Sequence, residues 1–136
     1  MQQLLEEFIS NAKRFAKIEL VNLYSKKINQ AQKREDAQAI YTQTLRPYLL
    51  DDGFNIALHP DAKELDSFEF AKILEREERV AFFIGGAYGF GEDFLQLCDM
   101  KMSLSKLTMS HKVAKIVLLE QIFRGFSIIH NHPYHK

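Results

Sequence analysis

The sequence predicts an α/β fold, a three-layer sandwich around a mostly parallel sheet, and three observations lead to that prediction. The chain has 136 residues, of which 46% are hydrophobic, enough to give one domain a substantial core. Segments with helical spacing alternate along the chain with short apolar segments. One of these, 80–84, is apolar at every position, as in a strand covered on both faces. We therefore expect residues 1–136 to form a single domain.

The first half of the chain contains two predicted helices and two predicted strands. Apolar residues recur at three- and four-residue spacing over 4–16, which predicts an amphipathic helix. Residues 18–24 alternate between apolar and polar, as a half-buried strand does. The polar stretch 25–34 predicts a loop, helical spacing returns over 37–48, and a short strand follows over 54–58.

The second half of the chain repeats this alternation. Either Asp66 or Ser67 can cap a helix that runs to about Arg76. The remaining predicted elements are a strand, a short helix, a strand and a long helix, at 80–84, 92–98, 100–104 and 113–129. The last of these is apolar almost all round, so we expect more than one neighbouring element to bury it.

The charges are balanced overall but not along the chain. There are 18 basic and 18 acidic residues, so the formal net charge is zero. The last 36 residues, 101–136, nevertheless carry 6 Lys or Arg and a single acid, Glu120, together with four of the five His. This basic end has two interpretations: a surface for an anionic partner, or a solvated tail.

Composition excludes several classes of protein. The single cysteine, Cys98, excludes a disulfide framework and a Cys-rich zinc module. No carboxylate lies near the histidines of the tail in sequence, and no H-E-x-x-H motif occurs, so we expect no metal. No apolar run approaches the roughly 18 residues that cross a membrane, and Glu6 and Glu7 stand where a signal peptide would be basic. We therefore expect a cytoplasmic protein without a membrane partner.

Two loops and one charged pair are candidate functional features. The glycine-rich segment 85–91 follows an apolar strand, where α/β sheets bind ligands, although a tight turn also explains it. It lacks the G-x-G-x-x-G fingerprint, which argues against a nicotinamide oxidoreductase. The segment 103–111 has many hydrogen-bonding groups, as a ligand loop or a plain connection would. Glu120 and Arg124 are spaced as a helical ion pair, and an arginine there can also bind phosphate.

Four segments in order give a specific resemblance. They are Phe82–Gly89, Leu104–His111, Leu119–Arg124 and the closing His132–Lys136. In this order they resemble the ribosomal large subunit methyltransferase H family, which belongs to the SPOUT superfamily of RNA methyltransferases. The resemblance is strong over residues 54–136 and weak before residue 50.

The resemblance implies a fold and a reaction. Such proteins are homodimers with a C-terminal deep trefoil knot, here about 80–129, followed by a tail at 130–136. They methylate N3 of a pseudouridine in helix 69 of 23S rRNA on the assembled 70S ribosome, using S-adenosylmethionine. The tail of one subunit completes the cofactor pocket of the other. Family members usually begin with a short apolar strand, whereas Met1 here opens into helix-like sequence, so we expect that edge strand to be missing, either because the given chain starts late or because the sheet lacks it.

The resemblance also implies site residues. The cofactor contacts would be Leu58, Gly85, Leu104, Ser105, Lys106, Leu107, Thr108 and Met109. The RNA-binding and catalytic positions would be Arg124, Tyr134 and His135, with Arg124 on phosphate and Tyr134 against the base. Neutral His135 or an ordered water would take the proton of N3. The alternative is a non-catalytic ribosome- or RNA-binding module with the same fold.

Overall fold

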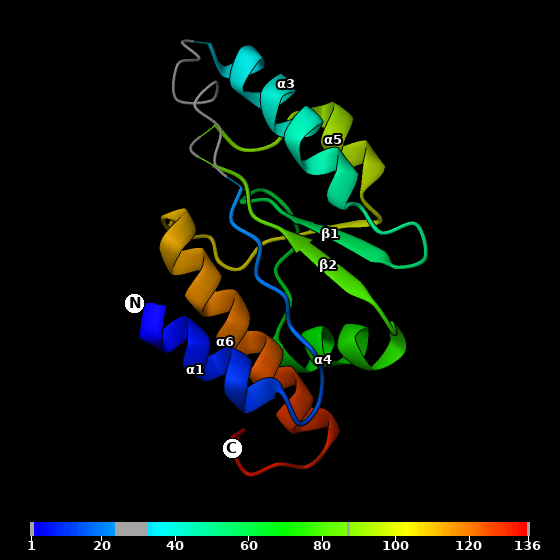
Figure 1. The fold of residues 1–136 in the computed structure, drawn as a ribbon, viewed down its shortest axis with the longest axis vertical. Helices are drawn as coiled ribbons and strands as arrows, with labels where there is room; N and C mark the ends of the chain where they lie inside the picture. Colours follow the sequence, from blue (N-terminus) through cyan, green and yellow to red (C-terminus); the bar gives the residue numbers. More distant parts are fainter. Residues whose placement is uncertain (1, 24–32, 87, 136) are drawn as a thin grey trace.

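The computed structural model describes residues 2–23, 33–86 and 88–135, and it confirms the predicted α/β fold (Figure 1). Three parallel strands form one sheet, and helices cover both of its faces. The middle strand is the most buried, with Asn55, Ile56 and Ala57 all buried, whereas the two outer strands are partly exposed and one of them carries the exposed Lys101.

The strand that comes first in the chain lies in the centre of the sheet. The strands are β1 (Phe54–Leu58), β2 (Val80–Phe83) and β3 (Met100–Met102), in the order β2-β1-β3. Both neighbours pair with β1 in parallel, with Phe54 opposite Val80 and Ile56 opposite Met100. Because parallel strands end at the same edge, the loops after β1, β2 and β3 all leave from one side of the sheet.

Helices form a layer on each face of the sheet (Figure 1). On one face lie α1 (Gln2–Ala12), α4 (Ser67–Arg76) and α6 (His111–Ile129). On the other face lie α3 (Arg34–Leu45), which continues into the 3₁₀ turn η1 (Arg46–Tyr48), and α5 (Glu92–Leu97). The sheet is therefore the middle layer of a three-layer sandwich, as the sequence predicts.

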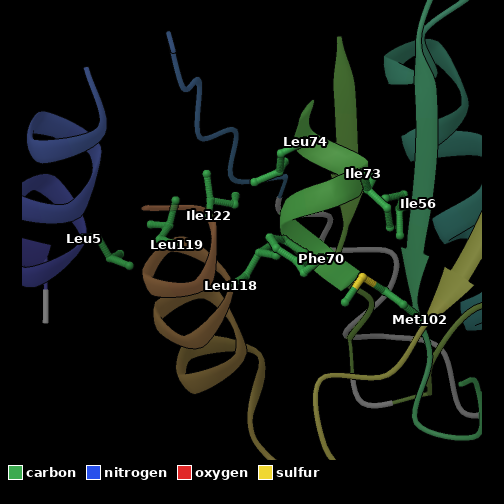
Figure 2. Close-up of a cluster of buried hydrophobic side chains, with 9 residues drawn as sticks. All are labelled: Leu5, Ile56, Phe70, Ile73, Leu74, Met102, Leu118, Leu119 and Ile122. Carbon is green, nitrogen blue, oxygen red and sulfur yellow. The ribbon is translucent and has the colours of Figure 1, made fainter. Parts of the chain in front are cut away.

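Two successive residues of β1 mark the two halves of the core. Ile56 and Ala57 are both fully buried, and the alternation of a strand sends their side chains to opposite faces. Figure 2 shows the first cluster, which contains Ile56 and side chains from α1, α4 and α6; Ile56 lies beside Ile73 of α4, and Leu5 of α1 lies at the other end of the cluster. Ala57 belongs instead to the second cluster, whose members are Leu45, Ala57, Phe83, Phe90, Phe94 and Leu95.

The long helix α6 is buried by two neighbours, which confirms the expectation from its apolar sequence. It packs against both α1 and α4. Gly125 faces α4 at close range, because a Cβ atom there would lie 2.7 Å from Cδ1 of Leu74. This close approach brings α6 against α4, and α6 carries the residues that precede the C-terminal tail.

The start of α4 is fixed by a capping box. The side chain of Asp66 accepts a hydrogen bond from the backbone N–H of Glu69 at 2.8 Å, and the Glu69 carboxylate accepts one from the backbone N–H of Asp66 at 3.1 Å. These bonds satisfy N–H groups that a helix start leaves without partners. Asp66 is thus the cap, of the two candidates that the sequence offers.

Replacing the cap by Asp66→Ala is expected to lower the free energy of unfolding by about 1 kcal/mol, because the backbone N–H of Glu69 loses its acceptor at the start of the helix. Urea denaturation followed by circular dichroism measures the change. The control is Lys72→Ala on the exposed side of the same helix, with an expected change within about 0.5 kcal/mol. Equal changes in both variants would contradict a stabilising cap.

Most predicted elements are present, with shifted ends. The helix predicted over 4–16 ends at Ala12, and the one predicted over 37–48 begins at Arg34 and tightens into η1 at Pro47. The strands β1, β2 and β3 and the helices α4 and α5 begin and end within two residues of their predicted limits. Helix α6 starts two residues earlier than predicted, since Ser110 caps it through the backbone N–H of Val113.

The strand predicted over 18–24 is wrong over the residues described. Residues 16–23 run as an extended connection and form no strand, and residue 24 lies outside the described ranges. The alternation itself is real, since Ile18 and Leu20 pack against the first core cluster while Glu19 and Val21 are exposed. A strand also needs a neighbour for its backbone, and none pairs with this segment in the described part of the chain. The loop predicted over 25–34 falls largely on residues outside the description.

Candidate functional site

The sequence-predicted cofactor residues lie at one edge of the sheet. Leu58 ends β1, Gly85 follows β2 by two residues, and Leu104 follows β3 by two. The backbone beyond β1 is joined to the end of β3, because the N–H of His59 donates to the carbonyl of Met102 at 2.9 Å. The structure thus brings the three segments to neighbouring strand ends, where α/β sheets form ligand crevices.

The loop after β3 is shaped by its own hydroxyl groups. The buried Ser103 donates through Oγ to the carbonyl of Ser105 at 2.9 Å, and Ser105 Oγ accepts from the N–H of Leu107 at 3.0 Å. The loop leaves the side chain of Leu107 78% exposed. Lys106 and Thr108 are exposed as well, while Met109 is half-buried. The loop therefore presents an ordered backbone beside an exposed apolar side chain, which suits a ligand with both polar and apolar parts.

The glycine-rich loop after β2 folds tightly over itself. A Cβ atom on Gly85 would lie 3.4 Å from the Cα of Gly89 and 3.4 Å from the ring of Phe90. Gly89 has φ +67°, in the left-handed region that favours glycine. The Tyr41 hydroxyl occupies the place of a side chain at Gly86. The close approach in this loop is therefore at Gly86, whereas a Cβ atom on Gly85 would make ordinary van der Waals contacts.

A cavity of about 310 Å³ lies next to the loop that follows β3. Of the predicted cofactor residues only Leu104 lines it, together with residues from α4, β3 and α6. Its walls are Leu65, Asp66, Ser67, Phe70, Met102, Ser103, Leu104, Val117 and Gln121. The walls combine five apolar residues with four polar ones, and the volume lies at the lower end of the range for small-molecule sites. Leu58 and Gly85 do not line this cavity.

A hydrogen-bonded chain leads from this cavity to the C-terminal tail. Ser67 Oγ donates to Gln121 Oε1 at 2.7 Å, and Gln121 Nε2 donates to Glu120 Oε2 at 3.2 Å. Neither Ser67 nor Gln121 was a predicted site residue. No pattern in the sequence marks either one, because their contact joins two helices that lie far apart in the chain.

Glu120, Arg124, Tyr134 and His135 form a cluster with Phe68, which we call the tail cluster. Arg124 Nε donates to Glu120 Oε1 at 2.7 Å, and about a quarter of each side chain is exposed. The Arg124 guanidinium lies over the ring of Tyr134, 4.9 Å from its centroid, and Arg124 Nη1 is 3.1 Å from His135 Nδ1. The three residues predicted as catalytic are therefore in mutual contact around one arginine.

Tyr134 is held against α6 as well. Its ring centroid is 4.6 Å from that of Phe123, and its hydroxyl donates weakly to Glu120 Oε1 at 3.5 Å. Partial burial and the Glu120 carboxylate raise the pKa of the Tyr134 phenol, although Arg124 acts in the opposite direction. The phenol therefore stays protonated at neutral pH, so Tyr134 offers a ring face and a hydrogen-bond donor rather than a base.

His135 is placed from a second direction by α4. Its ring meets Phe68 edge to face, with centroids 5.1 Å apart and planes at 89°. Phe68 is itself 55% exposed, so the contact lies at the surface. Earlier in the tail, the backbone N–H of His132 donates to the carbonyl of Ser127 in α6 at 2.8 Å. The tail thus folds back onto its own helix.

Cys98 does not provide a nucleophile. Burial, with the neighbouring Asp99 carboxylate, raises the pKa of its thiol to about 11, so the thiol stays protonated at neutral pH. Within the described ranges, no three His, Cys, Asp or Glu side chains are grouped to hold a metal ion. In the same ranges no helix combines the length and the apolar character that a membrane span needs.

Comparisons with known proteins agree on one family. The sequence model of a family described as "Predicted SPOUT methyltransferase" matches residues 1–135. Three relatives, from Nitratiruptor, Sulfurovum and Helicobacter pylori, are each named ribosomal RNA large subunit methyltransferase H. The Nitratiruptor protein is 58% identical over 136 residues, covering 99% of this chain and 89% of the relative. The Sulfurovum protein is 53% identical (98% and 88%), and the Helicobacter pylori protein is 50% identical (98% and 91%).

Proposed function

We infer the reaction from one premise: the chain belongs to the SPOUT methyltransferase family. It is an rRNA methyltransferase that takes its methyl group from S-adenosylmethionine. Its substrate in this proposal is N3 of a pseudouridine in helix 69 of 23S rRNA, and it acts on the assembled 70S ribosome in the cytoplasm. The observation that carries the proposal is the tail cluster, in which Arg124 contacts both Tyr134 and His135.

The proposed cofactor site uses the loops at the edge of the sheet. Leu58, Gly85 and residues 104–109 would hold S-adenosylmethionine, with loop amides and carbonyls toward the adenine and apolar side chains around its ring. The exposed Leu107 and the shaped backbone of its loop support this role. When bound, S-adenosylmethionine supplies a methyl group attached to a positively charged sulfur. The chain's main task is then to hold the acceptor nitrogen at attack distance from that methyl group.

The tail cluster would place the acceptor base. Arg124 would contact a backbone phosphate through its guanidinium, and Tyr134 would stack on the exposed base. The proton that leaves N3 has two candidate acceptors, neutral His135 and an ordered water. The excess of basic residues after residue 100 supports an anionic substrate at this end of the chain.

The proposal extends to the assembly and the chain path. Residues 80–129 would form a deep trefoil knot, followed by the tail at 130–136. Two copies would form a homodimer in which the tail of each reaches the cofactor loops of the other. A monomeric variant is then expected to be inactive even when its own tail cluster is intact.

Methyl transfer to ribosomes tests the proposal directly. Ribosomes from a strain lacking this enzyme are incubated with purified protein and S-adenosylmethionine, and the helix 69 fragment is analysed by mass spectrometry. We expect that fragment to gain the mass of one methyl group in 70S particles but not in free 23S rRNA. A methyl group elsewhere in the rRNA would refute the proposed target.

Cofactor binding provides a separate measurement. Isothermal titration of the purified protein with S-adenosylmethionine is expected to give a dissociation constant in the micromolar range. The variant Leu107→Asp tests the proposed cofactor loop by placing a carboxylate on it. We expect this variant to bind S-adenosylmethionine more weakly and to stay folded, since residue 107 is exposed. An absence of heat with the wild-type protein at high ligand concentration would instead indicate a non-catalytic RNA-binding module.

A further inference from the structure

We propose that His135 acts as a hydrogen-bond donor through Nε2–H, and that Glu120 is a positioning residue that fixes this state of the ring through Arg124. The proposal rests on the proposed function of the tail and deepens it by choosing between the two proton acceptors. The observation behind it is the contact of 3.1 Å between Arg124 Nη1 and His135 Nδ1.

The direction of that hydrogen bond follows from the chemistry of the two groups. A guanidinium has five N–H donors and no acceptor. Arg124 Nη1 must therefore donate, and His135 Nδ1 must accept. An imidazole whose Nδ1 lone pair is in use as an acceptor carries its single ring proton on Nε2. His135 then presents an N–H group, not a free lone pair, on its far side.

Glu120 makes this arrangement rigid. Its Oε1 accepts from Arg124 Nε at 2.7 Å, and because the guanidinium is planar, a bond at Nε also fixes the direction of the Nη groups. The carboxylate is itself held at its other oxygen by Gln121 Nε2 at 3.2 Å. The ring of Tyr134 lies against the guanidinium from the side. Arg124 is thus held by Glu120 on one side and by Tyr134 on another.

The ring of His135 is oriented from α4. Its edge-to-face contact with Phe68, at 5.1 Å and 89°, restricts rotation about the axis set by the Arg124 hydrogen bond. Two elements, α4 and α6, therefore determine where Nε2–H points.

A donor at this place has a specific use in the proposed reaction. N3 of a pseudouridine lies between two carbonyl groups, and negative charge builds on their oxygens as N3 loses its proton. Nε2–H can donate to one of these oxygens and stabilise that charge. When S-adenosylmethionine is bound, the N3–C bond would form from the electron pair of N3 while the C–S bond breaks and its electron pair stays on the sulfur, and the N3 proton would pass to an ordered water and then to solvent. Of the two proton acceptors, the water is the one that this geometry supports.

Nuclear magnetic resonance tests the ring state without any activity measurement. Two-bond ¹H–¹⁵N correlation spectra of protein labelled at histidine show which ring nitrogen carries the proton. In the wild-type protein at neutral pH we expect His135 to be protonated at Nε2 and unprotonated at Nδ1. The Nδ1–H form is expected to appear only in Arg124→Met and Glu120→Ala. A proton on Nδ1 of His135 in the wild-type protein would overturn the proposal.

Two pairs of variants test the role in turnover. His135→Gln keeps an N–H donor but has no basic nitrogen, so its kcat is expected to stay within about tenfold of wild type, whereas His135→Ala loses about 100-fold. Glu120→Gln keeps an oxygen for Arg124 Nε and is expected to retain more activity than Glu120→Ala. His130→Ala, an exposed histidine outside the tail cluster, is the control.

The outcomes separate this proposal from the proposed function. Equal losses in His135→Gln and His135→Ala would identify a general base and refute the donor role. Equal losses in Glu120→Gln and Glu120→Ala would refute positioning by Glu120. If wild-type protein transfers no methyl group to ribosomes, the proposed function fails, while the spectra still decide the state of the ring.

Discussion

Truncating the chain after Pro133 is expected to lower kcat for methyl transfer about 100-fold or more while the domain stays folded. The truncation removes Tyr134 and His135 and leaves Arg124 without two of its three partners in the tail cluster. It retains His132, whose N–H binds the carbonyl of Ser127 and whose ring packs at the edge of Phe123. The end of α6 therefore keeps the contacts of His132 and loses only that of Tyr134 with Phe123, so the main loss falls on the proposed site.

Three measurements separate these effects. Single-turnover methyl transfer on 70S ribosomes gives the rate, calorimetry gives cofactor affinity, and urea denaturation gives stability. The His130→Ala variant controls for a change near the end of α6 that leaves the tail cluster intact. A truncated protein with wild-type turnover would remove the tail from the mechanism.

Replacing Phe94 by Ala is expected to lower the free energy of unfolding by about 3–5 kcal/mol, a large share of the roughly 5–15 kcal/mol that stabilises a domain. Phe94 on α5 is 0% exposed. Its ring stacks on Phe90 at 4.9 Å and meets Phe83 edge to face at 5.2 Å. Phe90 also lies beside Gly85 in the loop after β2. The empty space left by Phe94→Ala is therefore expected to loosen that loop as well as the core.

The matched control is Leu97→Ala on the same short helix, where the side chain is 39% exposed. We expect the control to lose less than about half as much stability, since its side chain leaves little empty space behind. Thermal and urea unfolding give the free energies, and amide hydrogen exchange reports on the loop 84–91. Equal losses at the two positions would contradict a core centred on Phe94.

The sequence predicts the elements whose signal is local. The apolar run of β2 and the capping residues of α4 each define an element within a few neighbouring positions, and the structure has both. Apolar residues on nearly all sides of α6 likewise predict that more than one element buries it, and in the structure these elements are α1 and α4. The same local patterns fail for residues 18–24, because alternation marks which side chains are buried but not whether a neighbouring strand is present.

In the candidate site, too, local sequence patterns predict some of the contacts and not others. Glu120 and Arg124 are spaced as an ion pair in the sequence, and the structure contains that pair. The resemblance to a family is what singles out Tyr134 and His135. The contacts of Phe68 with His135 and of Ser67 with Gln121 depend on how α4 packs against α6, so no short stretch of sequence contains them. The contact of the Tyr41 hydroxyl with Gly86 likewise depends on the folded loop.

The order of the strands has a consequence during synthesis. β1 occupies the middle of the sheet, yet both of its partners, β2 and β3, are encoded after it. While the ribosome is still making those later segments, the emerging β1 has unpaired backbone on its two sides and a hydrophobic surface open to other chains. Sheet formation must also close long connections before any strand pairing is gained, which slows folding. The sheet can therefore be completed only after Met102 has left the exit tunnel.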